Sequence, residues 1–169
     1  MVSIDTIKLT VFFGSAILMI KNSESKRVEA KFAVYTYLDG LKYCIKAGNA
    51  KLQFQQDRAV DRMRDERFTN RFTVADLFPN DDPVDALKRE LLKLEVEHYI
   101  ETVKDTRFPK KAEMRVFGMR YSGDVYIKIR VELMKSDMSG INNGVFVMSF
   151  HYAERPFTAN QFPYKKAGV

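Results

Sequence analysis

The sequence predicts an α+β domain in which about eight mainly antiparallel strands, in one sheet or two, pack against two central helices. Three observations support this prediction. Apolar residues alternate with polar ones near both ends of the chain, as is typical of half-buried strands. The middle of the chain instead has apolar residues at helical spacing. No linker, repeat or low-complexity run separates these parts, and 169 residues of which 46% are apolar suit one domain over residues 1–169.

Residues 1–55 are expected to be rich in strands. The dipeptides Gly-Ser at residues 14–15 and Asp-Gly at 39–40 are turn signals of β-hairpins, and each lies between two alternating stretches. A further strand follows an Ala-Gly-Asn-Ala turn, where Leu52 and Phe54 point inward and their neighbours point outward. We therefore expect a five-strand meander with strands at residues 6–13, 16–22, 30–38, 41–47 and 51–55.

An apolar run near the N-terminus, residues 9–20, is bracketed by Lys8 and Lys21. It is too short to cross a bilayer as a helix, which takes about 20 residues, and the start of the chain lacks the features of a signal peptide. The single cysteine, Cys44, has no partner for a disulfide, which favours a small core residue in a reducing compartment. The sequence therefore predicts a cytoplasmic protein with no membrane partner.

The middle part, residues 56–105, is expected to be helical. Residues 57–68 have apolar side chains at helical spacing and charges on the other face. A second helix should begin at Pro83, because an aspartate just before it can cap the free amides and proline fits the first helical position. This helix is predicted over residues 83–105. Its apolar residues cover more than half of its circumference, which indicates packing on two sides.

The last part returns to a period of two. Residues 106–153 should form three antiparallel strands, at 113–121, 125–133 and 144–152. The third of these is apolar on both faces, so we expect it to lie inside a sheet. Residues 154–169 contain prolines and scattered aromatic residues and are expected to form an extended tail over the body of the domain.

The sequence lacks the signals of the commonest cofactor sites. It has neither a Gly-x-Gly-x-x-Gly motif after a strand nor a Gly-x-x-x-x-Gly-Lys-Ser/Thr phosphate loop. One cysteine and two histidines give none of the zinc-binding spacings. Asp81, Asp82 and Asp85 could suit a cation, but capping of the helix at Pro83 explains the whole cluster. We therefore expect no cofactor and no metal ion.

Charge is distributed unevenly along the chain, with a net +4 over residues 1–55, −4 over 56–105 and +6 over 106–169. Positive residues accompany aromatic residues in the two strand-rich parts. A sheet face of this composition could stack unpaired bases on its rings and neutralise phosphates. The alternative is a solvated face whose tyrosines cover the edge of the core. The residues predicted to bind nucleic acid are Lys31, Tyr35, Tyr37, Lys42, Tyr43, Lys46, Arg115, Phe117, Arg120, Tyr121, Tyr126, Lys128 and Arg130.

The predicted helix at residues 57–68 and the residues just after it carry a further group of cations. Carboxylates alternate with these cations, so opposite charges lie within reach of one another along the helix surface. Ordinary surface ion pairing is therefore expected for Arg58, Arg62, Arg64, Arg67 and Arg71.

The two histidines are the candidates for acid-base chemistry. His98 lies in the apolar arc of the second predicted helix, where it is either a base in a dry pocket or a hydrogen-bonded core residue. His151 follows an apolar strand, and together with arginines from neighbouring strand ends it has the residue types of a metal-free ribonuclease. The alternative is a partly exposed strand-end histidine beside surface charges. The catalytic set of the ribonuclease hypothesis is His151, Glu154, Arg120 and Arg130.

Two helices followed by three antiparallel strands with basic residues form an order that is similar to the arrangement of small RelE-like toxin ribonucleases. The similarity covers about the last half of the chain, and the predicted N-terminal strands depart from it. It implies a small metal-independent ribonuclease as one candidate function.

Our leading expectation is a non-enzymatic protein that binds single-stranded nucleic acid or RNA through the basic and aromatic sheet face. A third candidate is an adaptor or inhibitor that binds another protein through the acidic helical part or the aromatic tail. An exposed strand edge would also allow pairing with a second copy as a homodimer.

Overall fold

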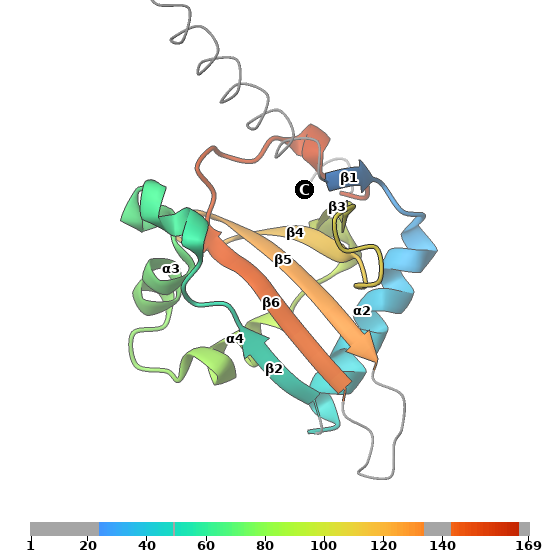
Figure 1. Cartoon of the computed structure of the whole chain (residues 1–169), viewed down its shortest axis with the longest axis horizontal. Coiled ribbons are helices and arrows are strands. Elements are labelled where there is room, and N and C mark those ends of the chain that lie inside the picture. Colours follow the sequence, from blue (N-terminus) through green and yellow to red (C-terminus); the bar gives the residue numbers. More distant parts are fainter. Residues whose placement is uncertain (1–23, 49, 134–142, 166–169) are drawn as a thin grey trace, which may run out of the picture.

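The computed structural model describes residues 24–48, 50–133 and 143–165. A six-stranded mixed sheet forms its centre, and the α-helices lie on one face of that sheet (Figure 1). The strands are β1 (Glu24–Arg27), β2 (Ala50–Phe54), β3 (Tyr99–Asp105), β4 (Met114–Arg120), β5 (Asp124–Leu133) and β6 (Asn143–Tyr152). The α-helices are α2 (Lys31–Lys46), α3 (Asn70–Leu77) and α4 (Pro83–Leu91). Short 3₁₀ helices are η1 (Ala59–Met63), η2 (Glu66–Phe68), η3 (Val96–His98) and η4 (Ala159–Gln161).

The strands follow the order β1-β3-β4-β5-β6-β2. Neighbouring strands are antiparallel except β2 and β6, which pair in parallel. The α+β class is confirmed, and so are the three C-terminal antiparallel strands and the position of β6 inside the sheet. The expectation of about eight mainly antiparallel strands is wrong, because the described chain forms six strands in a mixed sheet.

Helix α2 replaces the predicted hairpin of residues 30–47, so the predicted five-strand meander is wrong. Its buried side chains recur every three or four residues, which is a helical period and not a strand period. The Asp-Gly turn signal is overridden, and Gly40 lies inside the helix at a cost of about 1 kcal/mol relative to alanine. Burial of this stripe against the sheet offsets that cost. The buried stripe consists of Val34, Leu38, Leu41 and Cys44.

The helical part of the chain is more broken than predicted. Residues 57–68 contain η1 and η2 in place of one α-helix, and α3 follows them. Helix α4 begins at Pro83 as predicted, and the Asp82 carboxylate accepts hydrogen bonds from two amides of the first turn at 2.9 and 3.1 Å. The helix predicted over 83–105 ends at Leu91, and its last seven residues form β3. Apolar residues covered most of its circumference because two elements with different periods were combined.

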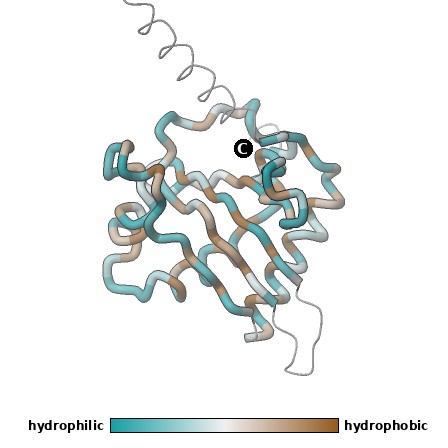
Figure 2. The backbone as a smooth tube through the Cα atoms, viewed as in Figure 1, coloured by the Kyte–Doolittle hydropathy of each residue, from teal (hydrophilic) through white to brown (hydrophobic). Residues whose placement is uncertain are grey.

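The main core lies between the helices and the sheet, where α2 and α4 pack on β4, β5 and β6. Hydrophobic and hydrophilic positions alternate along the strands, as Figure 2 shows. A second, smaller apolar cluster lies on the other face of the sheet, on which none of the described α-helices packs. It consists of Val103, Met114 and Val116, with Ile100, Tyr126, Phe146 and Met148 packed against them.

The C-terminal segment, residues 153–165, crosses one end of this second face (Figure 1). The amide of Phe157 donates a hydrogen bond to the Asp124 carboxylate at 2.7 Å. The rings of Phe157 and Phe162 meet edge to face, with centroids 5.5 Å apart. Both rings lie over Gly118 of β4, where any side chain would obstruct them.

Helices in the described ranges are too short or too polar to cross a membrane. The predicted hairpin of residues 6–13 and 16–22 lies outside the described residues. Cys44 is buried in the main core, as the sequence predicts.

Candidate binding groove

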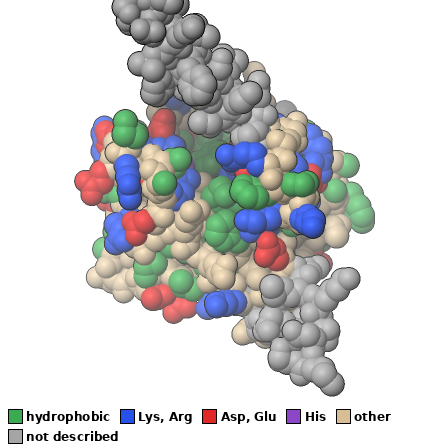
Figure 3. Space-filling model, in the orientation of Figure 1, with side chains coloured by type: hydrophobic (Ala, Val, Ile, Leu, Met, Phe, Trp, Pro, Cys, Tyr) green, Lys and Arg blue, Asp and Glu red, His purple; other side chains and the backbone are tan. Residues whose placement is uncertain are grey.

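The face of the sheet opposite α2, α3 and α4 is concave, and we call it the open-face groove. Glu24 on the edge strand β1 reaches Lys128 on β5, across β3 and β4, with 2.8 Å between Oε1 and Nζ. The sheet therefore curves strongly toward this side, and bulges in β3 and β6 are features that increase such curvature. Figure 3 shows this face hollowed near its middle, with apolar side chains at the bottom and cations on both sides.

The groove consists of three adjoining hollows. The largest, of about 990 Å³, lies between the segment of residues 55–64, the sheet and the C-terminal segment. Two smaller hollows, of about 490 and 410 Å³, share Tyr126 or Lys128 with it. The groove is therefore continuous from the C-terminal segment to the β3–β4 loop, and the second apolar cluster forms its floor.

A bulge in β6 decides which of its side chains line the groove. Ser149 and Val147 pair with consecutive residues of β5, so Met148 between them is the extra residue. The bulge shifts the alternation by one residue. Ser149 and His151 therefore face the groove, while Phe150 packs in the main core.

Asn70, the first residue of α3, holds this bulge in place. Its fully buried amide nitrogen Nδ2 donates to the carbonyl oxygens of Gln55 at 2.6 Å and Met148 at 2.9 Å. Its Oδ1 accepts a hydrogen bond from the amide of Phe150 at 2.9 Å. The side chain thus supplies partners for backbone groups where the bulge interrupts the sheet ladder.

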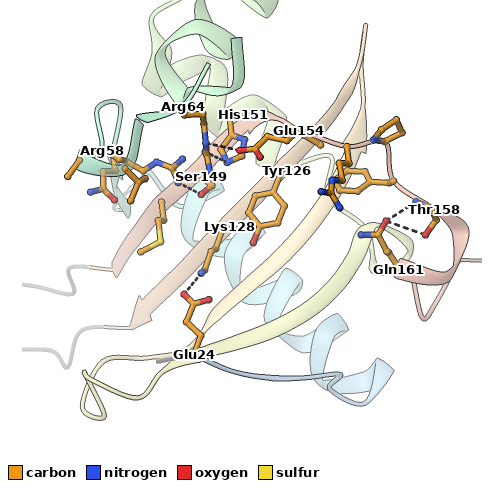
Figure 4. A pocket seen from close by; sticks show the side chains of 18 residues that line it. Glu24, Arg58, Arg64, Tyr126, Lys128, Ser149, His151, Glu154, Thr158 and Gln161 are labelled. Carbon is orange, nitrogen blue, oxygen red and sulfur yellow. Dashed lines mark hydrogen bonds and ion pairs between the residues drawn. The ribbon is translucent and has the colours of Figure 1, made fainter. Parts of the chain in front are cut away.

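His151 is a buried, neutral side chain in the wall of the groove (Figure 4). Its Nδ1 lies 2.9 Å from the carbonyl oxygen of Tyr152, which assigns the proton to Nδ1. Nε2 is then free to accept from Arg64 Nη1 at 3.4 Å. Burial lowers the pKa of His151 to about 4, and the nearby charges of Arg58 and Arg64 act in the same direction. The ring stacks on Tyr126, with centroids 5.4 Å apart.

Four cations that line the groove are neutralised by carboxylates of the same chain. Arg58 also donates to the Ser149 hydroxyl at 2.8 Å, and the Arg130 guanidinium lies 4.9 Å above the ring of Phe146. The Tyr126 hydroxyl, by contrast, has no hydrogen-bond partner among the described residues. The ion pairs are Arg58–Asp61 at 2.9 Å, Arg64–Glu154 at 2.8 Å, Lys128–Glu24 at 2.8 Å and Arg130–Glu132 at 2.6 Å.

The residues predicted to form one nucleic-acid platform lie on separate surfaces. Tyr37 is largely buried under Arg115, whose guanidinium carbon lies 4.3 Å from the ring centroid, and it stacks on Phe117. The other five residues predicted in the N-terminal part lie on the outer side of α2, behind the sheet. They are Lys31, Tyr35, Lys42, Tyr43 and Lys46.

The predicted residues of β4 and the β4–β5 turn also lie away from the groove. Arg115 faces the helices and pairs with Glu29 at 3.0 Å, next to the buried ring of Phe117. The Tyr121 hydroxyl donates a hydrogen bond to Oε2 of Glu90 in α4 at 3.0 Å, on the helix side of the sheet. Arg120 is 79% exposed and pairs with Asp124 at 3.0 Å. Only the residues of β5 from the predicted platform share the groove, and they are Tyr126, Lys128 and Arg130.

The residues of the ribonuclease hypothesis are brought together only in part. His151 and Glu154 both contact Arg64 in the largest hollow. Arg130 lies in the adjoining hollow, held against Glu132. Arg120, at the end of β4, pairs with Asp124 and lines a separate hollow beside the C-terminal segment.

His98 is half-buried and accepts a hydrogen bond at Nδ1 from the amide of Glu95, at 3.0 Å. Burial lowers its pKa. This contact closes the first turn of η3, so His98 has a structural hydrogen bond away from the groove. In the described parts of the chain no group of three or more His, Cys, Asp or Glu side chains is arranged to hold a metal ion.

Sequence reasoning missed several residues of the groove. Ion pairing is predicted for the arginine series and is present for Arg58, Arg64, Arg67 and Arg71. That expectation did not place Arg58 and Arg64 beside His151, because their proximity depends on how η1 and η2 pack on β6. No sequence motif marks Ser149 or Asn70, because the roles of both residues depend on the bulge in β6.

Comparisons of this chain with protein-family models, with curated proteins and with solved structures found no match.

Proposed function

We propose that this protein is a non-enzymatic binding module whose open-face groove holds an extended segment of another protein. One observation carries the proposal: residues 24–48, 50–133 and 143–165 leave a continuous groove with an apolar floor uncovered, on a sheet whose other face is packed against the α-helices. Uncovered apolar surface of this extent is typical of sites that bind a partner.

The chemistry of the groove suits a protein segment. The floor offers apolar contacts at Phe146 and Met148, which are only partly buried. The Tyr126 hydroxyl can donate to or accept from a peptide group, because no described residue occupies it. Charges of both signs lie on the rims, which favours a partner of mixed charge over one of a single sign.

Nucleic-acid binding through the sheet face stays a prediction, and the paired charges favour it less. A phosphate chain would have to displace carboxylates such as Asp61 and Glu24 from Arg58 and Lys128 before it gained those cations. A salt-titrated binding measurement with short single-stranded and double-stranded oligonucleotides tests this prediction. Ribonuclease activity also stays a prediction, and loss of any EDTA-resistant cleavage in His151→Ala is its test.

The proposed function is tested by selecting peptides from a phage-displayed library against the full chain and measuring their affinity by calorimetry. Met148→Lys places a charge on the floor of the groove, and we expect it to weaken binding by at least about tenfold. Met63→Lys is the matched control, because Met63 is 95% exposed on η1 and lines none of the three hollows.

The control variant should bind the selected peptides as the unmodified chain does. Failure of the library to yield a binding peptide would contradict the proposal, as would equal affinities of the two methionine variants.

A further inference from the structure

The outer side of α2 is a second surface, unrelated to the groove. At 100° per residue, seven of its side chains fall within about 120° of one another, opposite the buried stripe. Three of them are aromatic and strongly exposed: Phe32 at 80%, Tyr35 at 61% and Tyr43 at 69%. We call this surface the α2 outer face, and it consists of Lys31, Phe32, Tyr35, Asp39, Lys42, Tyr43 and Lys46.

This face lacks the ion pairs that Arg58, Arg64, Lys128 and Arg130 make in the groove. Within the described ranges, the three lysines make no ion pair and the three rings make no contact with another ring or cation. Asp39 is the only carboxylate among the seven side chains, so the face carries a net charge of +2.

Aromatic rings flanked by lysines on one side of a surface helix match the chemistry of a lipid interface. Rings of this kind settle at the level of the headgroups, and the lysine stems extend so that the ammonium groups reach lipid phosphates. We propose that the α2 outer face binds the surface of an anionic lipid bilayer.

Other occupants fit this face less well. A second copy of the same face would bring three lysines against three lysines, and like charges repel. A single nucleic-acid strand would stack its bases along a groove, whereas this face is the convex outer side of a helix. A flat anionic surface contacts all three rings and all three lysines together.

The sequence just before the described chain has a composition suited to the same environment. The nearly all-apolar run of residues 9–20, flanked by Lys8 and Lys21, precedes the described chain and α2 in the sequence. The sequence-based expectation of no membrane partner rests on this run being too short to span a bilayer and on the missing features of a signal peptide. It assigned residues 30–47 to strands, so a helical lipid-facing surface was not considered.

The test measures binding of the full chain to sedimenting vesicles of phosphatidylcholine alone and of phosphatidylcholine mixed with phosphatidylglycerol. Neutralising the α2 lysines together, as Lys31→Gln, Lys42→Gln and Lys46→Gln, should weaken binding to the anionic vesicles by roughly a hundredfold, since each lysine contributes about a factor of five near such a surface. Neutralising three cations elsewhere, as Lys51→Gln, Lys110→Gln and Lys165→Gln, removes the same charge. This control should change binding by less than about threefold, because long-range attraction is screened.

A second measurement reports on the rings directly. The chain has no tryptophan, so Tyr43→Trp supplies a single fluorescent reporter on the α2 outer face. Its emission should shift to shorter wavelength with anionic vesicles, whereas Phe108→Trp, on the β3–β4 loop, should not shift.

Three results would overturn the proposal. The first is anionic-vesicle binding that is unchanged by the α2 substitutions, and the second is no preference for anionic over neutral vesicles. The third is binding of a single-stranded oligonucleotide, lost in the α2 lysine variant, by a chain that binds neither kind of vesicle. That result would assign the face to nucleic acid.

Discussion

Replacement of Asn70 by alanine removes the side chain that holds the β6 bulge and with it the wall of the groove. The amide makes three hydrogen bonds to backbone groups, at 2.6, 2.9 and 2.9 Å, from a position with no solvent exposure. Asn70→Ala leaves the carbonyls of Gln55 and Met148 and the amide of Phe150 without these partners. An unsatisfied buried polar group costs about 1–3 kcal/mol.

Three such groups would cost about 3–9 kcal/mol in the free energy of unfolding. We expect a loss in the lower part of that range, about 3–6 kcal/mol, because Gln55 is only half-buried and its carbonyl can gain a water molecule. A loss of this size is a large share of the roughly 5–15 kcal/mol that stabilises a typical domain. Asn80→Ala is the matched control: Asn80 is exposed before α4, and its replacement should change stability by less than about 0.5 kcal/mol.

Urea unfolding followed by far-ultraviolet circular dichroism measures both variants, since the chain has no tryptophan to report unfolding. Asn70→Asp adds a further check. Its carboxylate still accepts from Phe150 but repels the two carbonyls, and protonation restores one donor. Its deficit relative to the unmodified chain should therefore shrink as the pH falls. A loss below about 1 kcal/mol in Asn70→Ala would refute the reasoning, because the bulge would then stand without this side chain.

Three further predictions concern pH, the C-terminal segment and α2. His151 has a folded pKa of about 4 against 6.5 for the unfolded chain, so the unfolded chain alone binds this proton between those values. Stability should fall by up to about 3 kcal/mol as the pH drops from 6.5 to 4, and His151→Gln should flatten that slope in pH-dependent urea unfolding; an unchanged slope would contradict the burial of a neutral histidine. In Gly118→Ala the new Cβ would lie 2.6 Å from the Phe157 ring and 2.9 Å from Phe162. We expect a loss of about 1–3 kcal/mol and faster proteolysis of residues 153–165, and unaltered cleavage would show that the segment does not pack there. Gly40→Ala meets no atom within 4 Å and should stabilise α2 by about 0.5–1 kcal/mol in thermal unfolding, whereas destabilisation would argue against a helix at this position.

The parts of the fold that the sequence predicted correctly are those with strong local signals. The alternating pattern of β5 predicts this strand, and the turn before it predicts its antiparallel pairing with β4. The capping aspartate Asp82 marks the start of α4, because its side chain bonds locally to the first turn.

The errors arise where local signals conflict with distant packing. The Asp-Gly pair of residues 39–40 is a hairpin signal, but the stripe through Val34 and Leu41 packs on the sheet only as a helix. The strand β3 was assigned to a helix because its apolar residues continue those of α4 with no proline or glycine between them.

The groove depends on contacts between residues far apart in the chain and could not be predicted from local patterns. Alternation alone, without the bulge at Met148, would turn His151 toward the helices. The prediction that Arg115 and Phe117 of β4 lie on the exposed basic and aromatic face was wrong for a related reason. Arg115 shares its side of the strand with Phe117, which packs in the main core.

Hydrogen exchange of backbone amides, measured on the full chain with and without a selected peptide, tests the binding groove most directly. The account predicts slower exchange in β5, β6 and residues 153–162 on addition of the peptide, and unchanged exchange in α2. Protection confined to α2 or to the helices behind the sheet would contradict it, since the bound segment would then lie outside the open-face groove.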